Sequence, residues 1–76
     1  MINKYFLHQI KSTNGTIEKG IVVKDTYDDA KQAYHAYLGA YAYGHDENTD
    51  FVQCSITGVS TAKPLIEETW LAPEHA

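Results

Sequence analysis

The middle of the chain repeats its apolar residues with the period of a helix. At about 100° per residue, residues 25–44 place tyrosine, alanine and leucine on one face and charged or amide side chains on the other. Thr26 followed by Asp29 resembles a capping box at the start of this segment, and Gly44 is suited to cap its end. The apolar stripe consists of Tyr27, Ala30, Tyr34, Tyr37, Leu38 and Tyr41. The pattern predicts one tyrosine-rich amphipathic helix over residues 25–44.

Two strand-like segments precede this helix. Residues 5–11 and 17–24 are rich in aromatic and branched side chains. The Asn14-Gly15 pair between them is the strongest short hairpin signal, because both residue types accept the positive φ of a type I′ turn. Gly20 in the second segment indicates either a bulge or a close approach by a neighbour. The sequence therefore predicts an antiparallel hairpin before the helix.

Two further strands are predicted after the helix. Residues 51–57 alternate between apolar and polar side chains, as expected of a strand. Residues 65–71 predict a last strand, and its two adjacent glutamates favour a position at the edge of the sheet. The chain thus reads as an α+β fold in the order ββαββ, with a single helix packed on a four-stranded antiparallel sheet. We expect one domain over residues 1–76.

Apolar residues occur on both sides of the predicted strands. In the first strand Leu7 opposes Phe6, and in the last strand Leu71 opposes Trp70. One helix covers only one face of such a sheet, and apolar residues on both sides of antiparallel strands suggest that both faces are buried. We therefore expect a homodimer or a docked partner on the face that the helix leaves uncovered.

Composition narrows the class of partner. The 76 residues include six lysines, no arginine and ten acidic residues, for a formal charge of −4. This argues against nucleic-acid binding, which relies on clustered basic residues, and often on arginine, to contact phosphates and bases. The single cysteine excludes an intramolecular disulfide and fits a reducing compartment. Because no apolar run has the length of a signal peptide or membrane span, we expect a cytoplasmic protein with no membrane partner.

No motif in the chain requires a particular chemistry. The run from Asp46 to Asp50 begins like a calcium-binding loop, but Phe51 stands where that loop needs glycine and Thr57 where it needs a bidentate glutamate. The four histidines lack the close spacing of a helical zinc pair. Cys54, set between branched residues, fits a small buried hydrophobic residue better than a nucleophile. We therefore expect a non-enzymatic protein with no catalytic residue, no metal and no cofactor.

Exposed aromatic and acidic residues are the candidates for a binding surface. Tyr43 falls outside the apolar stripe, and an exposed tyrosine offers a large rigid contact area at low entropic cost. His45 follows the helix and is placed to interact with the negative end of its dipole. The candidate interface residues are Tyr43, His45, Asp46, Glu47, Asp50, Trp70, Phe6 and His8.

The block from the segment Lys19–Lys24 through the segment Tyr41–His45 resembles short, uncharacterised proteins of gut-type bacteria and their prophages. The resemblance implies a bacterial or phage origin and a small accessory or inhibitor role, and it assigns no site residues. The leading hypothesis is a self-associating protein-interaction module. The alternative is a small-ligand-binding protein, with a pocket between the helix and the sheet or at a dimer interface.

Overall fold

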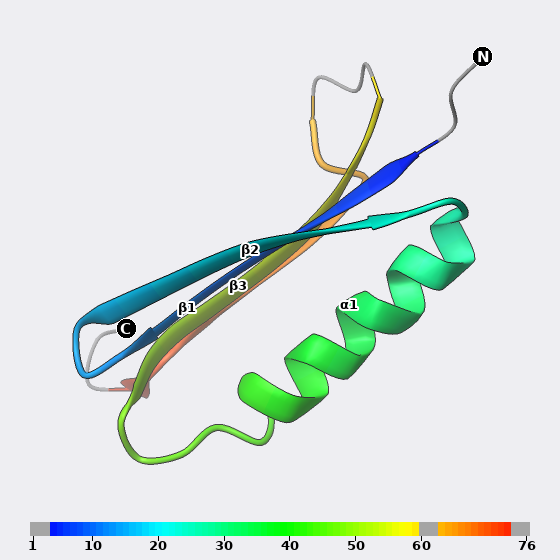
Figure 1. The fold of residues 1–76 in the computed structure, drawn as a ribbon. Helices are drawn as coiled ribbons and strands as arrows, with labels where there is room; N and C mark the ends of the chain where they lie inside the picture. Colours follow the sequence, from blue (N-terminus) through cyan, green and yellow to red (C-terminus); the bar gives the residue numbers. More distant parts are fainter. Residues whose placement is uncertain (1–3, 60–62, 74–76) are drawn as a thin grey trace.

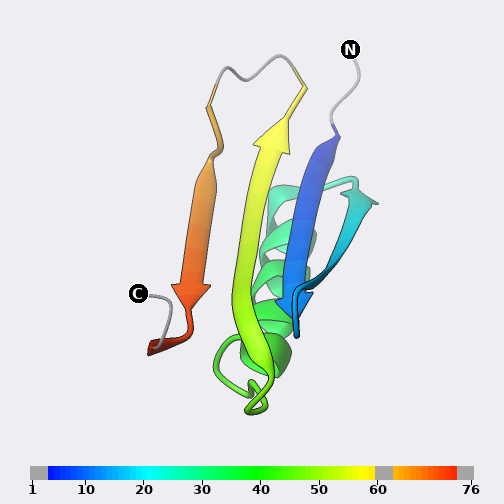
Figure 2. The same cartoon turned by 90° about the vertical axis from the view of Figure 1, so that its left-hand side faces the viewer.

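The computed structural model describes residues 4–59 and 63–73, and it contains one helix packed against one face of an antiparallel sheet (Figure 1). The elements are β1 (Tyr5–Thr13), β2 (Thr16–Lys24), α1 (Tyr27–Tyr41), β3 (Thr49–Gly58) and β4 (Ile66–Leu71). Across the sheet the strands lie in the order β2-β1-β3-β4, and each neighbouring pair is antiparallel. The predicted α+β class is confirmed, and so is the position of the last strand at an edge (Figure 2).

The β1–β2 hairpin closes at Asn14 and Gly15, as predicted. Both residues have positive φ, 51° and 81°, which a two-residue type I′ turn requires. The pairing of β1 with β2 runs without a break through Gly20, which lies opposite Gln9. Gly20 therefore marks no bulge. The register of the sheet shifts instead where Ser12 and Thr13 of β1 pair with β3.

The helix begins and ends within the predicted range. The Thr26 hydroxyl accepts a hydrogen bond from the Asp29 backbone N–H at 3.1 Å, which confirms the N-terminal cap. At the other end, the backbone N–H groups of Ala42 and Tyr43 both donate to the Leu38 carbonyl, at 2.8 and 2.9 Å. These bonds close the helix at Ala42.

The prediction of Gly44 as the C-terminal cap was wrong, because the cap is Ala42 in a right-handed conformation. Gly15 is the one glycine with positive φ in the part of the chain that the structure describes. Glycine is nevertheless favoured over other residues at position 44, because there is little room for a side chain. A Cβ at this position would lie 3.0 Å from the carbonyl oxygens of Gly39 and Ala40.

The core lies between α1 and the two central strands. Its helical members follow a four-residue spacing that centres the buried stripe on Ala30, Tyr34, Leu38 and Ala42. Tyr41, predicted to pack in this stripe, is 42% exposed, because Ala42 takes the buried position in the last turn. The sheet contributes Leu7, Val52, Cys54 and Ile56, each fully buried. The predicted burial of Cys54 is confirmed.

Candidate functional site

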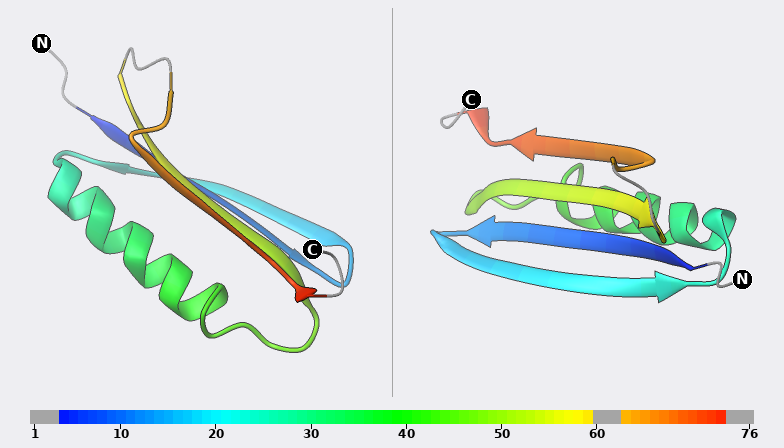
Figure 3. Two further views of the ribbon diagram at one scale, coloured as in Figure 1. Left: turned by 180° about the vertical axis from the view of Figure 1, so that it is seen from behind. Right: turned by 90° about the horizontal axis from the view of Figure 1, so that it is seen from above.

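The face of the sheet that turns away from α1 is a broad surface with exposed apolar side chains. Figure 2 views this face directly, with α1 behind the sheet, and Figure 3 shows the ribbon of Figure 1 from behind and from above. The register places Phe6 beside Val23, Ile10 beside Lys19, and Ser12 beside Ile17. Large apolar side chains of this face that are about half exposed are Ile17 (54%), Ile21 (60%), Val23 (52%) and Leu71 (49%). We call this surface the open face.

The apolar residues of the open face gather on its β1 and β2 side. On β3 the same face carries Gln53, Ser55 and Thr57, with Phe51 at one end. His8 joins the two halves, because its Nε2 lies 2.9 Å from the Thr57 hydroxyl. The open face thus combines an apolar strip with a row of short polar side chains.

The C-terminal end of α1 forms a second cluster, on the helix side of the sheet. The Tyr43 hydroxyl donates a hydrogen bond of 2.6 Å to the Glu68 carboxylate on β4, and this bond raises the pKa of Tyr43. The His45 ring stacks on Trp70 with 4.2 Å between centroids, and its Nδ1 donates to the Ala42 carbonyl at 2.8 Å. His45 therefore meets the negative end of the helix dipole, as predicted.

Two carboxylates of the acidic loop that follows the helix accept hydrogen bonds, Asp46 from within the loop and Asp50 from the hairpin. Asp46 Oδ1 accepts from the Asn48 backbone N–H at 2.8 Å and from the Thr49 hydroxyl at 3.2 Å. Asp50 Oδ2 accepts from the Ser12 hydroxyl at 3.0 Å and from the Gly15 N–H at 2.8 Å. Both carboxylates therefore shape the loop and the hairpin tip. Among the described residues, no group of three or more histidine, cysteine, aspartate or glutamate side chains is placed to hold a metal ion.

The predicted interface residues fall in two separate places. Phe6 and His8 lie on the open face, whereas Tyr43, His45 and Trp70 lie on the helix side. A cavity of about 250 Å³ joins His45, Asp46, Glu47 and Trp70 to the neighbouring residues Thr49, Ala72 and Pro73. Sequence reasoning did not select the exposed apolar residues of β2 as interface candidates. The sequence does indicate this surface, because Ile17, Ile21 and Val23 occupy alternate positions that lie on one side of a strand, with Lys19 at the position between Ile17 and Ile21.

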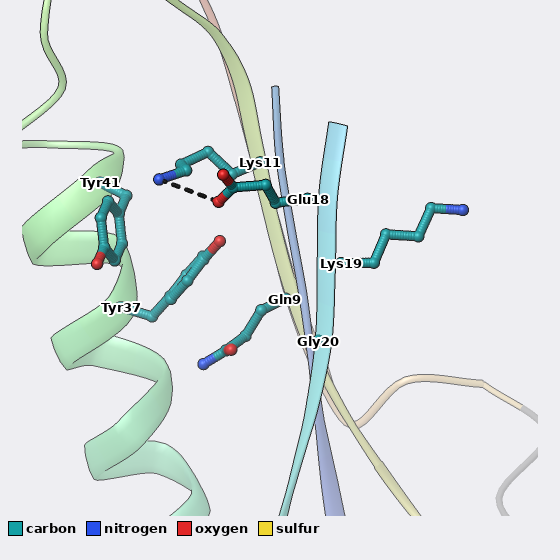
Figure 4. Close-up of a pocket in the computed structure, with 7 residues that line it drawn as sticks. All are labelled: Gln9, Lys11, Glu18, Lys19, Gly20, Tyr37 and Tyr41. Atoms are coloured by element: carbon teal, nitrogen blue, oxygen red, sulfur yellow. Dashed lines mark ion pairs between the residues drawn. The ribbon is translucent and has the colours of Figure 1, made fainter. Parts of the chain in front are cut away.

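A narrow cleft separates α1 from β2 (Figure 4). Tyr37 and Tyr41 enter it from the helix, and Gln9, Lys11 and Glu18 enter it from the strands, whereas Lys19 points away. Lys11 Nζ lies 3.5 Å from Glu18 Oε2 and 4.3 Å from the centroid of the Tyr41 ring. Gly20 has no side chain, so the cleft is open at this point. Its volume is about 150 Å³.

The buried titratable groups of the core are held neutral. Burial raises the pKa of Cys54 to about 11, and the nearby Glu68 carboxylate adds to the shift. Burial likewise raises the pKa of Tyr34 to about 12. A fully buried thiol with a raised pKa is a poor nucleophile, because the thiolate is the reactive form.

Comparison with known proteins adds no relative from which a function can be transferred. No family model matches the chain, and no curated protein or solved structure matches it. In the described part of the chain, no helix combines the length and the apolarity that crossing a membrane requires.

Proposed function

We propose that this protein is a small, non-enzymatic interaction module that associates with a second copy of itself through the open face. The observation that supports the proposal is the row of half-exposed branched residues on a sheet face that no described element of the chain covers. Monomeric proteins rarely leave large contiguous apolar patches in water, and such patches mark interaction surfaces. A second copy is the occupant that the size and charge of the face favour.

The area of the open face is sufficient for a dimer. Four strands at about 4.8 Å spacing, with lengths up to about 30 Å, give a face of about 500 Å². Two such faces in contact cover about 1,000 Å² in total, which is the lower limit for a specific interface. We therefore expect a dimer of modest affinity, with dissociation in the micromolar range.

The charge on the open face suits self-association although the chain as a whole is acidic. Lys19 at the β2 edge and Glu67 at the β4 edge are the charged side chains that the register places on this face. Their charges cancel, so two copies of a chain with formal charge −4 meet through a neutral surface. An isologous contact whose two-fold axis crosses the apolar strip places the strip of one copy on the same strip of the other.

Sedimentation equilibrium of the wild-type protein and of Ile10→Glu tests the proposal. Ile10 lies on the inner strand β1 beside Lys19, so the contact would have to bury a new carboxylate together with this lysine, at a desolvation cost that their attraction does not repay. We therefore expect association through the open face to weaken at least tenfold. Gln32→Glu is the matched control, because it adds the same charge at an exposed position of α1. A dimer that Ile10→Glu leaves unchanged, or a monomer at all concentrations, would overturn the proposal.

The role of this module in the cell is a further part of the proposal. The resemblance of residues 19–45 to short bacterial and prophage proteins supports an accessory or inhibitor role, in which the protein occludes a surface of a host protein. Production in an enteric bacterium measures this role as a change in growth or in phage plating. We expect the change with the wild-type protein and with Gln32→Glu, and its loss with Ile10→Glu. Equal effects of all three chains would contradict a role of the open face.

A second candidate function is the binding of a small polar ligand in the cleft between α1 and β2. The supporting observation is that two phenol rings, the Gln9 amide and the Lys11–Glu18 pair converge on one cleft. Its volume of about 150 Å³ admits only a small ligand or part of a larger one. Thermal-shift screening against amino acids and nucleotides tests this function. A shift seen in the wild type and lost in Tyr37→Phe supports it, and the absence of any shift contradicts it.

A further inference from the structure

β2 is a nine-residue strand at one edge of the sheet. In the described part of the chain it has one neighbouring strand, β1. β1 pairs with it along its whole length, and β2 is the first strand in the order of the sheet. Seven of its nine residues are exposed. α1 lies behind the sheet and leaves the outer side of β2 clear (Figure 2). An edge of this length presents backbone donors and acceptors on which another strand can pair.

The hairpin fixes which residues of β2 present those groups. Thr13 and Thr16 flank the two-residue turn and form a hydrogen-bonded pair, so every second residue from Thr16 bonds to β1. The residues between them direct their N–H and C=O groups outward. These outward residues are Ile17, Lys19, Ile21 and Val23.

We propose that two copies of this chain pair antiparallel along β2, with the two-fold axis at Ile21. In this register Ile21 forms a hydrogen-bonded pair with Ile21 of the second copy, and Lys19 forms one with Val23 on each side of the axis. The outward groups of all three residues are then satisfied. The product is one continuous eight-stranded sheet with both helices on the same side.

The side chains of β2 complement one another in this register. Glu18 lies directly opposite Lys24 of the second copy, and the symmetry repeats this ion pair at the other end of the contact. Opposite charges in such cross-strand positions stabilise a pair of strands. Gly20 lies opposite Val22, so the branched side chain faces the one position of β2 without a Cβ. The Glu18 side chain is 69% exposed beside Lys11 and remains accessible to a second cation.

The two registers whose axis is shifted toward the hairpin turn, to Gly20 or to Lys19, lack this complementarity. An axis at Lys19 places two lysines directly opposite each other, which is destabilising. An axis at Gly20 places Glu18 opposite Val22 and Lys24 opposite Thr16, so both charges lose their partners. Among these three registers, the charges favour the axis at Ile21.

This contact uses the backbone edge and does not depend on the open face of the proposed function. Its test uses Ile10→Glu as the background, so that the open face is disabled in every chain. In this background we expect a dimer that Glu18→Lys and Lys24→Glu each weaken by about tenfold, because each change sets two like charges opposite each other. The combined variant exchanges the charges and should restore the dissociation constant to within about twofold.

A second variant tests the backbone pairing. Ile21→Pro removes an outward N–H, which an edge strand tolerates, and it should abolish the dimer while circular dichroism stays unchanged. A monomeric Ile10→Glu chain would overturn the edge contact and leave the open face standing. If Ile10→Glu leaves the dissociation constant of the wild-type dimer unchanged, whereas Glu18→Lys and Lys24→Glu each weaken it and their combination restores it, the open-face proposal is overturned and the edge contact stands. A charge-exchanged chain as weak as the single variants would overturn the register.

Discussion

Removing the Asp50 carboxylate should destabilise the fold more than any other change in the acidic loop. This carboxylate, at the start of β3, binds the hairpin tip of β1 and β2 across 35 residues of sequence. The Gly15 N–H donates to it at the turn, and the hydroxyl of Ser12, a buried residue of β1, donates to the same oxygen. Asp50→Ala deletes the oxygen that accepts both hydrogen bonds. It leaves in place the backbone carbonyl of residue 50, which accepts from the Ala72 N–H.

The expected cost follows from the burial of the two donors. Ser12 is 3% exposed, so its hydroxyl loses a partner that water replaces poorly, at about 1–3 kcal/mol. Gly15 is exposed, so water replaces its lost bond and the additional cost is about 1 kcal/mol. Asp50→Ala should therefore cost about 2–4 kcal/mol. For a domain of this size that lowers the melting temperature by roughly 10–25 °C.

Urea unfolding monitored by circular dichroism measures this effect. Glu47→Ala, in the same loop and exposed, is the matched control and should stay within about 0.5 kcal/mol of wild type. Ser12→Ala combined with Asp50→Ala should cost less than the sum of the single changes, because the two residues share one hydrogen bond. If Asp50→Ala costs no more stability than Glu47→Ala, the carboxylate does not hold the hairpin. The same conclusion follows if the costs of Ser12→Ala and Asp50→Ala are additive.

Four other residues give shorter predictions. Leu38→Ala should cost about 2–5 kcal/mol in urea unfolding, because Leu38 is 2% exposed in the core. Native Cys54 should react with a thiol reagent only as fast as the chain unfolds. The raised pKa values of Cys54 and Tyr34 favour the neutral groups in the fold, so the contribution of these two groups to stability should be constant below about pH 9 and should be lost between about pH 9 and 12. Tyr34→Phe should reduce the upper part of this loss. Replacing the Tyr43 partner by Glu68→Gln should lower the pKa of Tyr43 in a spectrophotometric titration.

The elements of the fold were predictable because each has a local cause. The positive φ of Asn14 and Gly15 and the Thr26 cap depend on residues that are adjacent or nearly adjacent in sequence. The helix end was less predictable. Its last bonds converge on the Leu38 carbonyl, and Gly44 contributes through close carbonyl contacts and not through a left-handed φ. Glycine after a helix thus has two physical causes that a sequence does not distinguish.

The candidate site was less accessible to sequence reasoning, since it depends on the order of strands. Phe6 and Trp70 are both aromatic residues on strands, yet the register puts them on opposite sides of the sheet. Asp46 and Asp50 looked like free surface charges, but each accepts hydrogen bonds that a residue pattern does not reveal. These bonds also decide which substitutions can test whether the negative charge of the loop contributes to partner binding. Glu47→Gln changes charge without disturbing the loop, whereas Asp50→Asn changes both.

The position of β2 links association to stability. A chain of 76 residues has a small core, and here that core joins α1 mainly to β1 and β3. β2 is attached to β1 on one side, and Val22 and Lys24 are its only residues that are not exposed. A second copy adds buried apolar area on the open face of this strand, or backbone bonds along its edge. Either contact acts at the least buried strand of the sheet. Because binding to the folded state stabilises it, the melting temperature of this protein should rise with its own concentration.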